Sequence, residues 1–197
     1  MIVVRWADDF DVGFQHQSDA VRFHQEVAER FAKFKLKLHP EKTRVIEFGR
    51  YAAERRKGRG QGKPETFNFL GFTHICGKNR SNGMFKVVRR TMGKRKHAKL
   101  QAVKVELRKR MHQRVAEVGK WLRSVVEGHN RYYGVPMNLP SLRSFRYHVS
   151  RYWYRRLRRR SQKQRLTWSR MLRLTACWLP RPKLYHPYPD RRLGVIT

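Results

Sequence analysis

The sequence has few cysteines, few acidic residues and no long apolar run. Its two cysteines, Cys76 and Cys177, lie far apart and form no Cys-x-x-Cys pair, which argues against a zinc site and a disulfide framework. No apolar segment reaches the length of a membrane span, and no signal peptide is visible. We therefore expect a cytoplasmic protein that does not enter a membrane.

Acidic residues are also unevenly placed. The 197 residues include 47 Lys+Arg and 14 Asp+Glu, for a net charge of +33. Residues 1–50 hold 9 of these basic and 8 of these acidic residues, and residues 51–197 hold the other 38 and 6. A near-neutral front and a strongly cationic back indicate a polyanionic partner, most simply nucleic acid. A basic membrane-surface protein is the alternative, but the charge is spread over too many segments for one amphipathic anchor.

Two adjacent acids near the N-terminus, Asp8 and Asp9, lie between the apolar runs 2–4 and 10–14. Valine, isoleucine and aromatic residues favour strands, and the short connection fits a hairpin turn. Neighbouring carboxylates repel each other, and a divalent cation such as Mg²⁺ removes that conflict. Metal ions held by carboxylates support nucleotidyl transfer. The other interpretation is an ordinary polar turn.

The rest of the first half predicts a mixture of elements. A helical pattern begins at Ser18 or Asp19 and continues to about Phe34, and we expect it to pack on a sheet. Residues 45–48, 66–72 and 84–88 are typical of strands, with the first returning beside the acidic hairpin. Residues 50–65 show no periodicity and predict an exposed loop.

The second half predicts three amphipathic helices, over about 94–127, 141–160 and 167–179, joined by short connections. Such helices form a bundle, so the predicted fold class is α+β. The expected inner faces of the helices are these: Leu100, Val103, Leu107, Met111, Val115, Val118, Leu122 and Val125; Leu142, Phe145, Val149, Tyr152 and Trp153; Met171, Leu172 and Leu174.

Four blocks resemble those of group II intron-encoded reverse transcriptases with a maturase region, and they occur in the family's order. Residues 5–10, Arg-Trp-Ala-Asp-Asp-Phe, resemble the Tyr-Ala-Asp-Asp box. Residues 36–43, Leu-Lys-Leu-His-Pro-Glu-Lys-Thr, and residues 69–72, Phe-Leu-Gly-Phe, resemble the next two blocks. Residues 128–134, Gly-His-Asn-Arg-Tyr-Tyr-Gly, with Trp153 to Ser161 and the start at Leu166-Thr167-Trp168, resemble the maturase-specific X region.

The resemblance implies two domains: residues 1–90 as the end of a reverse-transcriptase palm, an antiparallel hairpin with a helix, and residues 91–197 as the maturase or thumb bundle. It implies Asp8, Asp9 and Lys42 as catalytic residues, with the two acids binding Mg²⁺. The residues implied near nucleotide and primer are Trp6, Ala7, Phe69, Leu70 and Gly71. Trp6 and Lys35 depart from the family, which usually has Tyr and Gly at these positions.

In that family the fingers and a third catalytic Asp precede this region, and this chain starts one strand before Asp8. Asp11 and Asp19 lie downstream, so neither fits that third role by position. We therefore expect a weak, incomplete Mg²⁺ site and no RNA-directed DNA polymerase activity by this chain alone.

The expected partners are group II intron RNA, possible target DNA and a separate polypeptide that carries the fingers and early palm. Arginine and lysine neutralise phosphates, and aromatic rings stack on unpaired bases. Tyr132 and Tyr133 are expected in a loop after the first long helix. The candidate RNA-binding residues are Arg55, Arg56, Lys57, Arg59, Arg131, Tyr132, Tyr133, Arg155, Arg156, Arg158, Arg159 and Arg160. The alternatives are a stand-alone RNA-binding splicing factor and a general cationic nucleic-acid binder.

Overall fold

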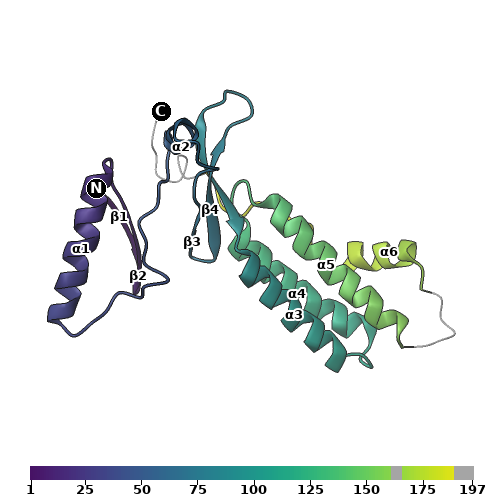
Figure 1. The fold of residues 1–197 in the computed structure, drawn as a ribbon. Helices are drawn as coiled ribbons and strands as arrows, with labels where there is room; N and C mark the ends of the chain where they lie inside the picture. Colours follow the sequence, from purple (N-terminus) through teal and green to yellow (C-terminus); the bar gives the residue numbers. More distant parts are fainter. Residues whose placement is uncertain (161–165, 189–197) are drawn as a thin grey trace. The chain divides into compact units, whose positions relative to one another are not determined.

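The computed structural model describes residues 1–160 and 166–188. These residues form an α+β fold with six helices and two small antiparallel sheets, of two and three strands (Figure 1). The predicted fold class is confirmed. The chain divides into two compact units. The N-terminal unit comprises Met1–Phe69 and Ile75–Val87, and the helical unit comprises Leu70–His74 and the described part of Val88–Thr197.

The N-terminal unit begins with the predicted acidic hairpin. Strands β1 (Ile2–Trp6) and β2 (Asp9–Gly13) pair antiparallel, from Ile2 opposite Gly13 to Trp6 opposite Asp9. The predicted helix follows as α1 (Gln17–Lys33). No α1 residue is buried, and all of β1 is exposed. The helix therefore does not bury its apolar side on a sheet as expected, although Phe14 and Phe23 meet with ring centroids 5.2 Å apart.

Two predictions for the following segment are wrong. Residues 45–48 form no strand, and Phe48 instead packs edge to face on Phe67 with ring centroids 4.9 Å apart. The predicted loop over 50–65 contains a seven-residue helix, α2 (Ala52–Gly58), which buries Ala52. A helix of two turns is too short to show a clear period, so the pattern could not reveal it.

The three-stranded sheet has the order β3 (Phe67–Phe69), β4 (Phe72–Lys78) and β5 (Phe85–Thr91). The single strand predicted over 66–72 is interrupted at Leu70 and Gly71, which have φ values of 48° and 78°. Two consecutive residues with positive φ are typical of a type I′ turn, whose twist suits a tight hairpin. The turn therefore reverses the chain between β3 and β4.

Four helices make up the rest of the described chain: α3 (Gly93–Lys109), α4 (Val115–Tyr133), α5 (Leu139–Arg158) and α6 (Trp168–Trp178). The prediction of three is wrong because the first apolar stripe is divided between α3 and α4. The backbone N–H of Arg114 donates to the Glu117 carboxylate at 3.3 Å, which stabilises the new start of α4. Helix α4 also continues through Tyr132 and Tyr133, so the loop predicted there is wrong.

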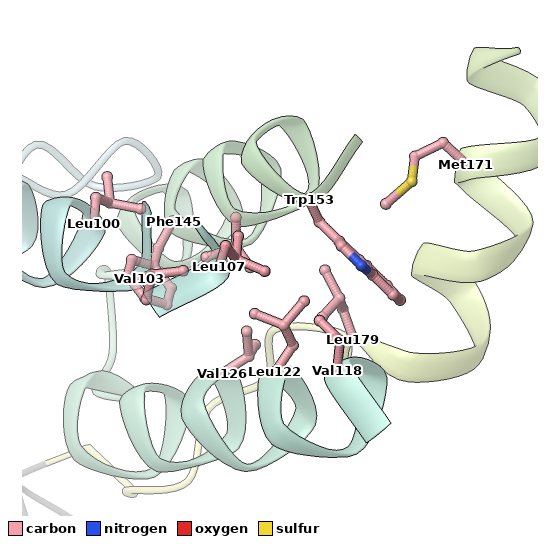
Figure 2. Close-up of a cluster of buried hydrophobic side chains, with 11 residues drawn as sticks. Leu100, Val103, Leu107, Val118, Leu122, Val126, Phe145, Trp153, Met171 and Leu179 are labelled. Carbon is pink, nitrogen blue, oxygen red and sulfur yellow. The ribbon is translucent and has the colours of Figure 1, made fainter. Parts of the chain in front are cut away.

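The core lies among these four helices, and Figure 2 shows Trp153 of α5 directed toward Met171 of α6 and toward Leu179. Most predicted inner positions are confirmed, but Leu172 is 51% exposed. Gly119 allows close approach of α6, since a Cβ there would lie 2.4 Å from the Trp178 ring. The buried cluster is Leu100, Val103, Leu107, Val118, Leu122, Val126, Phe145, Val149, Trp153, Met171 and Leu179.

Two arginines of neighbouring helices donate hydrogen bonds to carbonyls at the end of α6. Arg146 of α5 donates from Nη2 to the carbonyls of Thr175, at 3.0 Å, and Leu179, at 3.1 Å. Arg123 of α4 donates to the Cys177 carbonyl at 2.7 Å. The last carbonyls of a helix lack partners within the helix and carry partial negative charge, so these guanidinium groups fix α6 to its neighbours.

Candidate nucleic-acid interface

The acidic hairpin presents its carboxylates at an exposed tip. Ala7 has a φ of 54° in the two-residue turn, Asp8 follows it, and Asp9 begins β2. Paired residues of an antiparallel ladder project to the same face, and that face alternates along a strand. The register of Asp9 with Trp6 and of Asp11 with Val4 therefore puts Asp9 and Asp11 on one face.

Asp11 is a candidate metal ligand, although its position downstream of Asp9 does not fit the third catalytic Asp of the family. Burial raises the pKa of Asp11, and the nearby Asp9 carboxylate raises it further. Carboxylate oxygens suit Mg²⁺, which keeps several waters and needs only one or two protein carboxylates. In residues 1–160 and 166–188, no group of three or more His, Cys, Asp and Glu side chains is placed to hold a metal ion. The signal in the sequence that could have identified Asp11 is the two-residue period of a strand, which puts residues 9 and 11 on the same face of β2.

Lys42 lies apart from this hairpin in sequence, in a turn where its N–H donates to the His39 carbonyl at 3.1 Å. Its side chain is exposed. Among the residues that the structure describes, no ion pair joins Lys42 to Asp8 or Asp9. The catalytic role of Lys42 stays a prediction.

The β3–β4 turn and the end of α4 meet in an aromatic cluster within the helical unit. The Tyr132 hydroxyl donates to the Leu70 carbonyl at 3.0 Å. The Phe72 ring stacks on Tyr132, with centroids 6.0 Å apart, and meets Tyr133 edge to face at 5.2 Å. Leu70 and Gly71, implied near the primer, thus lie against Tyr132 and Tyr133, predicted to bind RNA. Both tyrosines are held by internal contacts, which sequence reasoning could not anticipate.

The buried His129 extends this cluster inward. Its ring stacks on Phe145 with centroids 3.7 Å apart and lies 4.7 Å from the Tyr133 ring. Burial, followed by the charges of Lys99 and Lys96, lowers the pKa of His129 to about 4. The imidazole is therefore neutral at physiological pH and acts here as a packed aromatic side chain.

Gly71 is expected to be more sensitive to substitution than other turn glycines. Gly71→Ala should lower the free energy of unfolding by about 2 to 5 kcal/mol, since an L residue at positive φ costs about 1 to 2 kcal/mol and crowding adds about 1 to 3. The new Cβ would lie 3.0 Å from the Tyr133 hydroxyl. Gly83→Ala is the matched control, because Gly83 has a φ of 67° and no atom within 4 Å of its Cβ position. Equal losses for the two variants in urea unfolding would contradict the packing argument.

The basic cluster on α2 is partly neutralised by the fold. Arg56 forms an ion pair with Glu65 at 3.6 Å, and Arg59 forms one with Glu47. Arg55 lies over the Tyr51 ring at 6.0 Å, and Lys57 is exposed. Arg55 and Lys57 therefore remain the better candidates for RNA contact in this segment.

Acidic residues are too few to neutralise α5. Between residues 88 and 188 the only acids are Glu106, Glu117 and Glu127. Glu106 pairs with Arg110 at 2.8 Å, Glu117 accepts from the α4 start, and Glu127 pairs with Arg131 at 2.7 Å. In the described structure, the arginines of α5 consequently have no acidic partner, whereas Arg131 of α4 is neutralised by Glu127.

One stripe of α5 alternates aromatic and cationic side chains. Arg151 lies over the ring of Tyr147 at 6.0 Å and over that of Trp168 at 5.8 Å. Arg158 lies over the Tyr154 ring at 5.7 Å. Spacings of four and three residues put these side chains along one line of the helix. Tyr147 and Arg158 are exposed, while Arg151 and Tyr154 are half-buried. Guanidinium and aromatic planes in such a line match the chemistry of phosphates and unpaired bases.

A surface hollow of about 650 Å³ lies beside this stripe, between α3 and α5. Its lining is Lys104, Tyr152, Arg155, Arg156, Arg158 and Arg159. Four of the five arginines predicted over residues 155–160 to bind RNA thus converge on one concave site. Lys104 and Tyr152, which were not predicted to bind RNA, also line this site. Lys104 faces the same way because α3 packs along α5.

Arg160 differs from these arginines. It donates to the Gln113 carbonyl at 2.6 Å, and burial lowers its pKa. Its contact closes the connection between α3 and α4, so its role in the described structure is internal. The predicted motif position Ser161 lies outside the described residues.

No protein-family model matches the chain, and no curated protein matches it. No helix in the described part of the chain combines the length and apolar character needed to cross a membrane.

Proposed function

We propose that this protein binds RNA through the α5 surface of its helical unit. The observation that carries the proposal is the group of arginines around the hollow, which no acid in the described part of that unit neutralises. Nucleic-acid phosphates supply the missing negative charge, and the neighbouring aromatic rings offer planes for base stacking. An acidic protein could also supply negative charge, but it has no bases to stack on the alternating aromatic rings.

The resemblance of four ordered blocks supports a more specific proposal: the C-terminal part of a group II intron reverse transcriptase and maturase, which binds intron RNA for splicing and mobility. Target DNA and a polypeptide with the fingers and early palm belong to this proposal as partners, and the cytoplasm as location. Asp8 and Asp9 would hold Mg²⁺, with Asp11 on the face of Asp9. When bound, that ion would supply charge stabilisation for nucleotidyl transfer.

The alternative of a general cationic binder is distinguished by where its charge matters. For such a binder, any two exposed arginines of the helical unit contribute equally. For the proposed interface, arginines of the hollow contribute more than those elsewhere on the same helices. A stand-alone splicing factor shares the interface and differs only in making no use of the acidic hairpin.

The test compares two double variants of equal charge. Arg155→Gln with Arg159→Gln removes two exposed arginines from the hollow, and Arg143→Gln with Arg173→Gln removes two exposed arginines outside it. The first pair should lower the salt slope of binding to a structured RNA by about two, one for each lost phosphate contact, and the second by much less. Fluorescence anisotropy at several salt concentrations gives both slopes. Equal losses would favour the general binder.

A further inference from the structure

We infer that the hollow between α3 and α5 receives one unpaired nucleotide of the bound RNA, with its base stacked on Tyr152 and its phosphates held by the surrounding cations. This inference rests on the proposed function and adds the form of RNA that the site selects. It concerns one concave site rather than the cationic surface as a whole.

The positive charge around the hollow would be neutralised by several phosphates that lie close together. Lys104 projects from α3, Arg155 and Arg156 project from the last turn of α5, and Arg159 is the residue that caps its C-terminal end. Among residues 1–160 and 166–188, no acidic side chain lines the hollow. Like charges at such density repel one another, and a bent polynucleotide strand brings two or three phosphates into the space where they are needed.

The shape of the hollow selects against a regular duplex. Its volume, about 650 Å³, lies in the range of pockets that enclose small organic molecules. In an RNA duplex the bases are stacked inside, and the outer surface that meets a protein consists of sugars and phosphates. Only an unpaired nucleotide can project its base into a concavity and reach a tyrosine at its wall.

Tyr152 is suited to receive that base. It is half-buried and packs against the helical core, so its ring is held in position before any ligand arrives. It lies at spacings of three, four and seven residues from Arg155, Arg156 and Arg159, which puts all four side chains on one side of α5. A base on the ring would therefore have its own phosphate beside guanidinium groups.

The experiment uses the full chain and two RNAs that differ by one nucleotide: a duplex with a single-nucleotide bulge and the same duplex without it. The wild-type protein should prefer the bulged RNA by roughly 5- to 150-fold, the range that one stacked base contributes. Tyr152→Leu keeps apolar packing and removes the aromatic face, so the preference should disappear. Tyr152→Phe keeps the face and should retain it.

A second measurement needs no variant. A 4-thiouridine at the bulge should cross-link under long-wavelength light to Tyr152 or to its hollow neighbours, and mass spectrometry of the peptides locates the link. Cross-links confined to other segments would overturn the inference, as would equal wild-type affinity for the two RNAs. Inorganic tripolyphosphate could also displace both RNAs while Tyr152→Leu binds them as tightly as the wild-type protein does. That result would show that the hollow binds phosphate only, and it would also overturn the inference. Failure to bind any RNA at low salt would instead refute the proposed function.

Discussion

Raising the monovalent salt concentration from about 50 to 200 mM should weaken binding of a structured RNA by about three to five decades. This is the range for six to ten phosphate contacts on duplex DNA, and RNA can give a shallower slope. The hollow alone offers five cations, and Arg151 of the stripe with exposed lysines of α3 extends the surface. Each contacted phosphate releases counterions, so the loss of affinity follows from the number of contacts.

The measurement is a titration of labelled RNA at constant pH over several salt concentrations. Asp8→Asn is the matched control for a change of charge outside the interface, because Asp8 lies in the near-neutral segment 1–50 and is exposed at the hairpin tip. It should leave the slope unchanged. A nearly flat salt response of the wild-type protein would refute an electrostatic RNA interface.

The sequence predicted correctly the elements with a sustained hydrophobic period and those joined by a short turn. The β1–β2 hairpin followed from apolar residues on both sides of Ala7-Asp8, and α6 followed from Thr167, whose hydroxyl accepts from the Arg170 N–H at 3.4 Å. The break between α3 and α4 was not predictable in the same way, since the apolar stripe keeps its phase from Leu107 to Val118. No glycine or proline marks that break; the contact of Glu117 with the Arg114 backbone does.

The sequence predicted which residue types make up the candidate site, but not which of those residues face solvent and which make internal contacts. Residues 155–160 were singled out as a basic run, but a run does not say which members are internal. Arg160 closes a helix connection although it belongs to this basic run, and Arg146, an isolated arginine in the sequence, completes α6. Tyr132 and Tyr133 were expected in a loop because a Gly-His-Asn sequence is typical of a turn, whereas α4 buries His129 and Asn130 and continues past them; Tyr132 is 54% exposed on this helix.

Lys104 and Tyr152 were missed for a related reason. Tyr152 falls on the apolar stripe of α5 and was assigned to the core, and it does pack there while its ring also lines the hollow. Lys104 is one of many lysines on α3, and only the packing of α3 along α5 distinguishes it. Residues that act at the edge between core and surface require the structure, because helical period alone assigns them to one side or the other.

Acidification from pH 8 to pH 5 should lower the free energy of unfolding by about 2 kcal/mol through His129 alone. Its pKa is about 4 in the folded protein, against 6.5 for an unperturbed histidine. The unfolded state therefore binds the proton first, so this stability is fully present above pH 6.5 and is lost as pH falls toward 4, up to about 3 kcal/mol. A protonated ring would have Lys96 and Lys99 nearby, and its buried Nε2 has no hydrogen-bond partner in the described structure.

Urea unfolding at intervals between pH 8 and pH 4 measures this dependence. His129→Phe keeps the stacking on Phe145 and removes the titrating group, so its stability should fall much less over the same interval. His148→Gln is the control, because His148 is exposed on α5 and its loss should leave the wild-type profile in place. The pKa of His74 is also lowered, first by burial and then by Arg89, so a residual slope in His129→Phe is expected and should disappear when His74→Gln is added. A His129→Phe protein with the full wild-type pH dependence would show that His129 is not the group responsible.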